Sequence, residues 1–322
     1  MKTYITRRLL LMIPVLIGIS MIIFLLINMA PGDPYSRLIE TNPEITAEDY
    51  QRMLDAIGYN DPIPLKYAKW VRQVLTGNLG YSIADNQPIG QMLVRRMQNT
   101  LMLALPALII STIISVPLGV FSAVKQYSIL DTILTLFALL GISIPAFYLA
   151  LLLIKILAFD LGFFPIQGMM TIDANYQGLQ FIMDRLYHAF LPLLVLSVLQ
   201  IASRMRYTRA SMLEIINQDY IRTARSKGLS ERAVIYKHAL RNALIPVVTV
   251  LSISLGSLLS GAVLTENVFM WPGMGRLVYT AITNRDYPVV MAGTMVLAVM
   301  MLAANLLADI TYAFVDPRIR YD

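Results

Sequence analysis

The side chains that most often carry catalysis or bind metals are scarce in this sequence. Its 322 residues include no cysteine and only two histidines, His188 and His238. Without cysteine there is no thiolate nucleophile, no disulfide and no Cys-ligated metal. We find no spacing typical of a nucleotide-binding loop, a zinc-protease helix or a serine-hydrolase elbow. The sequence therefore predicts a chain that is not an enzyme and binds no cofactor of its own.

A few charged residues lie within or beside apolar segments, where they could serve ion or proton transport. Asp309 lies near the end of the last apolar segment, and Lys155 can either extend to the membrane interface or pair with the nearby Asp160. One carboxylate near an interface is a weak proton relay. An ion-coupled secondary transporter, which would need a coupling carboxylate or inverted repeats near the midplane, remains an alternative. We expect Arg204 and Arg206 to end the fourth apolar segment and to anchor it at the inner face.

The most unusual stretch is basic and broken by glycine: QDYIRTARSKGLSERAVIYKHALRN, residues 218–242. Asp219 suits the first turn of a short helix, and Gly228 suits a left-handed end. Ser230 can then cap a second helix that leads into an apolar segment. Gly228 and Leu229 would form a corner with little side-chain bulk. We predict that this corner presses into a groove on a soluble partner, although a basic loop that binds lipid headgroups has the same pattern.

The composition places these residues in a membrane protein. Hydrophobic residues make up 57% of the chain and charged residues 14%, against about 25% in soluble domains. Because the basic residues gather at the ends of apolar segments, the net charge of +6 indicates a lipid bilayer as the surroundings and not nucleic acid. We predict an all-α fold, a single membrane-spanning domain over 1–322, with six transmembrane helices. They are expected at 9–30, 100–124, 132–159, 189–205, 243–265 and 289–314.

The basic residues also predict the orientation of the chain. Lys2, Arg7 and Arg8 precede the first span, nine Lys and Arg lie within 204–241, and Arg318 and Arg320 follow the last span. The positive-inside rule then places both termini and the loop 204–242 in the cytoplasm. The two histidines fall on opposite faces of the membrane and cannot share a metal ion. A cleaved signal peptide is an alternative for the first span, but its apolar run is longer than a usual signal core.

The segment 31–98 is predicted to be an external helical segment. Thr46 can cap one helix that Gly58 ends, and Gly77 can end a second helix. These helices could form a cap over a transport path or a lid without contact to substrate. Small and polar residues in the spans could line such a path but more often pack helices together. They are Ser143, Ser252, Ser254, Gly256, Ser257 and Ser260.

Several spans contain a proline, which removes a backbone donor and bends a helix unless a neighbour compensates. These residues are Pro14, Pro106, Pro117, Pro145, Pro192 and Pro246.

Several motifs resemble those of ATP-binding cassette importer permeases of the dipeptide, oligopeptide and nickel group. YIRTARSKGLSERAVIYKHALRNALIP resembles the cytoplasmic loop of that family, and RRLLLMIPVLIGISMIIFLLINMAPGDP resembles its first span. LTGNLGYSI, TENVFMWPGMGRLVYTAITNRDYPVVMAG and DITYAFVDPRIRY resemble its external segment, last external loop and C-terminal end. The resemblance implies a subunit of a bacterial or archaeal cytoplasmic (inner) membrane importer, for di- or oligopeptides or for nickel or another small ligand.

In that family the cytoplasmic loop is the coupling helix that docks on an ATPase subunit. The resemblance carries this role to Asp219, Tyr220, Arg222, Thr223, Ala224, Arg225, Lys227, Gly228 and Leu229. It also implies a second homologous permease subunit, two ATP-binding subunits that hold ATP and magnesium, and an extracytoplasmic substrate-binding protein. Arg222 and Thr223 stand where the wider importer pattern has Glu and Ala, so a glutamate contact to the ATPase is not expected.

Overall fold

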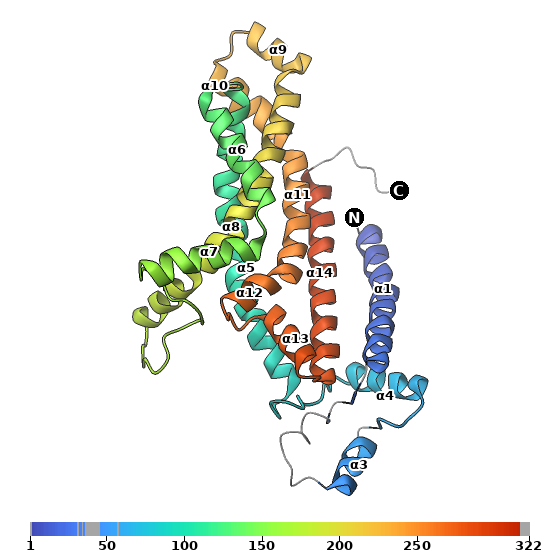
Figure 1. Ribbon diagram of the computed structural model, residues 1–322. Helices are drawn as coiled ribbons and strands as arrows, with labels where there is room; N and C mark the ends of the chain where they lie inside the picture. The colour runs from blue at the N-terminus through green and yellow to red at the C-terminus, as the bar shows by residue number, and fades with distance from the viewer. Residues whose placement is uncertain (1, 31, 34, 36–45, 57, 316–322) are drawn as a thin grey trace.

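The computed structural model describes residues 2–30, 32–33, 35, 46–56 and 58–315, and helices form most of this part of the chain (Figure 1). Five helices are long: α1 (Lys2–Met29), α5 (Ile89–Val124), α8 (Leu179–Ile216), α11 (Leu240–Gly261) and α14 (Tyr287–Val315). The all-α prediction is confirmed for the described residues.

Among the described residues, four helices are long and apolar enough to cross a membrane. They contain the segments Ile5–Met29, Ile89–Val124, Leu179–Ile216 and Tyr287–Thr311, and a bent pair of helices brings the count of candidate spans to five. The fifth predicted span coincides with α11, but the side chains of residues 249, 252–253, 255 and 257–261 lie outside the described part of the structure. A six-span topology therefore stays a prediction.

The third predicted span is not one continuous helix. It consists of α6 (Ile129–Ser143), α7 (Ala146–Leu153) and the π-helix η1 (Ile154–Asp160), with a bend of 103° between the two parts. The break falls at Ile144 and Pro145, because proline lacks an amide donor and disfavours helical backbone in the residue before it. Ile144 accordingly has extended backbone angles of −78° and 123°. The other prolines within the described helices leave them continuous.

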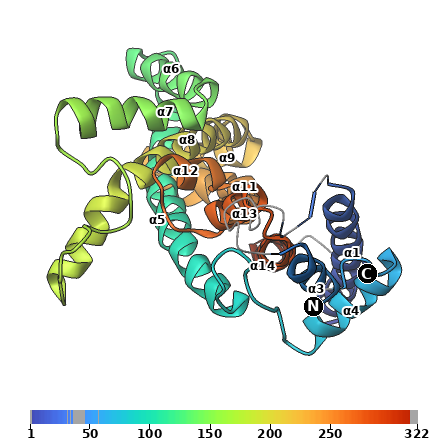
Figure 2. The same cartoon turned by 60° about the horizontal axis from the view of Figure 1, so that its bottom comes forward.

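Close packing of α5 and α6 on α8 depends on small residues. A Cβ atom on Gly119 of α5 would lie 2.6 Å from Thr208 Cβ, and one on Gly141 of α6 would lie 2.5 Å from Ala202 Cβ. These glycines let the helix backbones approach, as small residues do in membrane bundles. α11 packs along α14, and α1 stands on the far side of α14 from the rest of the bundle (Figure 2).

Two charged residues of the predicted spans are paired. Arg8 Nη1 of α1 lies 3.1 Å from Asp309 Oδ2 of α14, so Asp309 has a structural partner. Lys155 Nζ donates to Asp160 Oδ2 at 2.7 Å, as the sequence predicted.

The prediction for Arg204 was wrong. α8 continues to Ile216, so Arg204 and Arg206 do not end the helix. Arg204 is only 2% exposed, and its guanidinium donates to Ser111 Oγ of α5 and to Gln200 Oε1 of α8. The helix is longer than the apolar segment because residues after Met205 still pack on α5, at the contact between Thr208 and Gly119.

The two helices predicted in the segment 31–98 are α3 (Ala47–Ala56) and α4 (Ile63–Leu75). Thr46 caps α3, since its Oγ1 accepts from the amide of Asp49 at 3.2 Å. Gly58 and Gly77 follow the two helices with φ of +67° and +76°, as glycine at a helix end allows. Figure 1 shows α3 and α4 at the opposite end of the molecule from α9 (Asp219–Ser226).

Candidate functional site

The predicted docking segment lies at one end of the molecule, between the last residues of α8 and the first of α11 (Figure 1). α9 begins at Asp219 and ends before Gly228, which has a φ of +75°. Ser230 Oγ accepts from Ala233 N at 3.4 Å and caps α10 (Glu231–Ala233). The chain then continues through the π-helix η2 (Val234–Ala239) into α11. The local helices and the corner are therefore as predicted.

The inner face of α9 is packed against the membrane helices. Ile221 is fully buried and Ala224 is 8% exposed. Their cluster joins α5, α8, α9, η2 and α11, and its members are Val120, Ala123, Met212, Ile221, Ala224, Val234, Ile235, Ala239 and Ala243. Ser211 Oγ of α8 also donates to the carbonyl of Ala243 in α11 at 2.9 Å. A force on α9 would therefore reach three long helices through η2 and the side chains of this cluster.

The outer face of α9 carries most of the predicted docking residues. Eight of the nine are exposed: Asp219, Tyr220, Arg222, Thr223, Arg225, Lys227, Gly228 and Leu229. The ninth, Ala224, lies on the inner face and packs within the chain. Tyr220 and Leu229 are 45% and 43% exposed, so the surface offers two apolar side chains among cations. Such an arrangement suits a groove with an apolar floor and acidic rim.

Arg225 makes its principal contact inside the chain. Its Nη2 and Nε donate to the two carboxylate oxygens of Glu231 at 2.8 and 3.1 Å, across the corner at Gly228. The Arg225 guanidinium lowers the pKa of Glu231, and the Glu231 carboxylate raises the pKa of Arg225. Because the pair joins α9 to α10, Arg225 holds the shape of the corner.

A second carboxylate near this end was not identified from the sequence. Asp131, at the start of α6, accepts from Arg209 Nε at 2.8 Å and Nη2 at 2.9 Å. It also accepts from the amide of Tyr127 at 3.0 Å and from Ser122 Oγ. These bonds tie α6 to α5 and α8 beside the docking segment. The available signal was that Asp131 is the lone carboxylate within residues 86–159.

A third carboxylate lies in the segment of the chain that joins α11 to α14, away from the docking segment. Glu266 of α12 (Val263–Val268) is fully buried, and accepts from Thr100 Oγ1 of α5 at 2.7 Å and from Arg276 N of α13 (Met274–Thr283) at 3.0 Å. Burial raises the pKa of Glu266. A Cβ on Gly273 would collide with this carboxylate, which explains a glycine there. The signal was a glutamate followed by closely spaced glycines in TENVFMWPGMG.

Three of the small residues considered for a transport path, Ser143, Ser254 and Gly256, have side chains or positions that the structure describes. The Ser143 and Ser254 hydroxyls donate to carbonyls of their own helices, at 2.8 and 2.7 Å. Gly256 is buried against α14, where a Cβ would lie 3.6 Å from Ala304 Cβ, in agreement with the packing interpretation. The side chains of Ser252, Ser257 and Ser260 lie outside the described residues.

The solved structures include folds similar to this one. Two inward-facing structures of the MetNI methionine ABC transporter match with TM-scores of 0.56 and 0.53, at 19% and 20% sequence identity. Each match covers 71% of this chain and 98% of the other chain. At this identity the similarity supports the fold alone.

Two curated relatives match over their full length. The oligopeptide transport system permease protein AppB of Bacillus subtilis (strain 168) is 42% identical, over 100% of both chains. The dipeptide transport system permease protein DppB of Escherichia coli (strain K12) is 40% identical, over 100% of this chain and 99% of the relative.

Two family models match consecutive parts of the sequence. Residues 1–104 match the N-terminal region of binding-protein-dependent transport system membrane components. Residues 115–321 match the model described as binding-protein-dependent transport system inner membrane component. With the helical membrane fold and the full-length relatives, these matches show that the chain belongs to the family of binding-protein-dependent transport system inner membrane components.

Proposed function

We propose that this chain is a permease subunit of an ATP-driven importer that carries di- or oligopeptides across the cytoplasmic membrane of a bacterium or archaeon. The peptide substrate is supported by AppB and DppB, which are named as oligopeptide and dipeptide permeases and align with the whole of this chain. An external binding protein would deliver the peptide, as the family description implies.

The observation that carries the energetic part of this proposal is the two-sided packing of α9. The outer face of α9 and the corner after it are exposed and mix Tyr220 and Leu229 with basic residues, while Ile221 on the inner face is fully buried in a cluster with side chains of α5, α8, η2 and α11. The chain has no nucleotide-binding loop in its sequence, so ATP and magnesium would be held by two partner ATPase subunits. Their movement would act on the outer face and reach the membrane helices through the inner face.

The proposed topology has six spans, with α9 in the cytoplasm. Its crossings are α1, α5, the bent α6–α7–η1 segment, α8, α11 and α14. Figure 1 is consistent with this arrangement, because α1 begins and α14 ends toward the α9 end, while α3 and α4 lie at the opposite end. The basic residues favour the same side for α9. A second homologous permease subunit would complete the path.

The docking role can be tested with the exposed apolar side chains of the corner. We would replace Tyr220 and Leu229 together by alanine and use Tyr236→Ala as the control, since Tyr236 is 59% exposed and lies outside the predicted docking residues. The assay is the ATPase activity of the complete complex in proteoliposomes, with and without peptide-loaded binding protein. Truncation of interface anchors typically costs about 2 kcal/mol or more each, which is at least a tenfold loss of affinity.

We expect the double variant to insert into the membrane normally and to lose most ATPase subunits on purification, together with the stimulated ATPase activity. Tyr236→Ala should behave as the wild-type chain does. Full stimulation in the double variant would show that α9 is an ordinary surface loop, and the site of energy coupling would then have to be sought elsewhere in the chain.

A further inference from the structure

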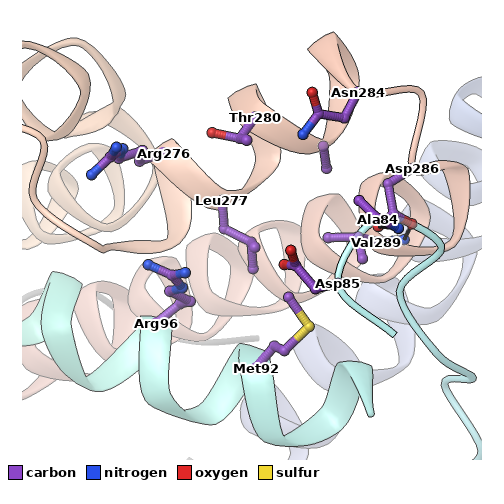
Figure 3. A pocket seen from close by; sticks show the side chains of 11 residues that line it. Ala84, Asp85, Met92, Arg96, Arg276, Leu277, Thr280, Asn284, Asp286 and Val289 are labelled. Atoms are coloured by element: carbon purple, nitrogen blue, oxygen red, sulfur yellow. Dashed lines mark hydrogen bonds between the residues drawn. The ribbon is translucent and has the colours of Figure 1, made fainter. Parts of the chain in front are cut away.

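A pocket at the end opposite α9 has two arginines on one side and acidic groups on the other (Figure 3). It has a volume of about 250 Å³ and lies between α5, α13, the start of α14 and the loop before α5. Figure 3 shows Arg96 and Arg276 toward one end and Asn284 and Asp286 toward the other, with Asp85 between them beside Leu277 and Met92.

The two arginines face the pocket without a carboxylate directly bound to either of them among the described residues. Arg96 has no side-chain hydrogen bond or ion pair within this part of the chain; the charge of Arg276 repels it, and the carboxylates of Asp85 and Glu266 attract it. One Arg276 nitrogen, Nη1, donates to the carbonyl of Met270, which fixes the guanidinium in place. Two partly buried guanidiniums at one end of a pocket favour an anion, and their planar donor groups match a carboxylate.

The two carboxylates of the pocket, Asp286 and Asp85, differ in how many hydrogen bonds they already accept. Asp286 is 3% exposed and accepts from Ser82 Oγ at 2.5 Å and from the amides of Ala84 and Val289 at 3.3 and 3.4 Å. It therefore holds the loop before α5 in place. Asp85 is exposed and its carboxylate has no hydrogen-bond partner among the described residues, so it is available for a cation.

The helices that carry the arginines are held by a well-packed apolar base. Met92, Leu277 and Val289 line the pocket and belong to one buried cluster that joins α5, α13 and α14. Arginines on packed helices keep their position when the pocket is empty, which reduces the entropy lost on binding.

From this charge separation we propose that the pocket binds a zwitterionic peptide during its passage, with the peptide carboxylate at Arg96 and Arg276 and its ammonium group at Asp85. This assignment rests on the proposed peptide import and on the external position of this end of the molecule. It adds a substrate contact on the membrane subunit itself.

The test uses the complete complex in proteoliposomes with binding protein loaded with alanyl-alanine. Two quantities are measured: peptide transported per ATP hydrolysed, and the concentration of loaded binding protein that gives half-maximal ATPase activity. The variant is Arg96→Gln, and the matched control is Arg95→Gln, the neighbouring exposed arginine of α5 that does not line the pocket. Asp85→Asn, in an exposed position, is a second variant with little risk to folding.

Losing a hydrogen bond to a charged group costs roughly tenfold or more in affinity. We expect Arg96→Gln to lower transport per ATP by about this factor and Asp85→Asn to lower it in the same direction. The half-maximal concentration of binding protein should stay unchanged in both, and Arg95→Gln should match the wild type in both measurements.

Three results would overturn the assignment. A higher half-maximal concentration in Arg96→Gln, with normal transport per ATP, would mean that the arginines contact the binding protein instead of the peptide. Equal transport in Arg96→Gln and Arg95→Gln would leave the pocket without a role in passage. Absence of alanyl-alanine transport in the wild-type complex would remove peptide import itself, and it would be seen before any variant is compared.

Discussion

Glu266 is the buried group whose replacement should be most informative about the fold. Its carboxylate accepts from Thr100 Oγ1 at 2.7 Å and from Arg276 N at 3.0 Å, and no part of the residue is exposed. Glu266→Ala leaves both donors without this acceptor. The Thr100 hydroxyl can turn to a carbonyl one turn back in α5, but the buried Arg276 amide stays unpaired, so the substitution should lower the free energy of unfolding by about 1–3 kcal/mol.

Glu266→Gln should cost far less, about 1 kcal/mol at most. The glutamine carbonyl can still accept from Arg276 N, and its amide can donate to Thr100 Oγ1. That oxygen has two lone pairs, of which the amide of Met274 uses one at 2.8 Å. The Thr100 hydroxyl can then donate to a carbonyl one turn back in α5.

The same pair of variants predicts a pH dependence. Burial raises the pKa of Glu266, so the folded chain keeps its proton to higher pH than the unfolded chain, whose pKa is about 4.3. Between these two pKa values the folded state binds more protons, and its stability falls as pH rises. As the pH rises between these two pKa values, the free energy of unfolding of the wild type should therefore fall relative to that of Glu266→Gln.

The assay is unfolding in mixed detergent, followed by tryptophan fluorescence. The chain has two tryptophans, and a Trp70→Phe background leaves Trp271, which is fully buried and donates from Nε1 to the carbonyl of Asn99 at 2.9 Å. Equal losses in Glu266→Ala and Glu266→Gln would refute the hydrogen-bond reasoning. No loss in either would show that this carboxylate does not hold the segment between α11 and α14.

Two further predictions concern helix packing, and the same unfolding measurement checks both. Gly119→Ala should cost about 1–3 kcal/mol, because its Cβ would lie 2.6 Å from Thr208 Cβ, whereas Gly18→Ala, with no atom within 4 Å, should be neutral or slightly stabilising. A neutral Gly119→Ala would contradict the close approach of α5 and α8. Arg209→Met should cost about 3–5 kcal/mol, since it leaves the buried Asp131 carboxylate unpaired, and adding Asp131→Asn should restore much of the loss. A double variant no more stable than Arg209→Met would argue against the pair.

Local sequence signals were sufficient for the docking segment and for the helices between the first two long spans. Asp219, Gly228 and Ser230 predict two short helices and a corner because each acts on backbone groups within a turn of itself. The same holds for Thr46 and Gly77 around α3 and α4. The helices, caps and turns at these positions are as predicted.

Local signals were not sufficient where a distant helix decides the environment of a side chain. Arg204 resembled an interfacial anchor, but α8 extends past it and hydroxyl and carbonyl groups of α5 surround its guanidinium. Pro145 could have produced a mild bend, as the other helix prolines allow, yet the chain turns by 103° there. Neither outcome can be obtained from residues within one helix.

The sequence by itself determined the membrane class, the positions of most apolar helices, the basic end and the family, because hydropathy, charge and local capping act over short stretches of chain. Only the tertiary structure decided which face of α9 is exposed, that Arg225 is paired with Glu231, and that Glu266 joins α12 to α5 and α13. It also brought Arg96, Asp85 and Arg276 to one pocket. The physical reason is that burial and pairing depend on contacts between residues far apart in the chain, and the packing of long helices creates these contacts.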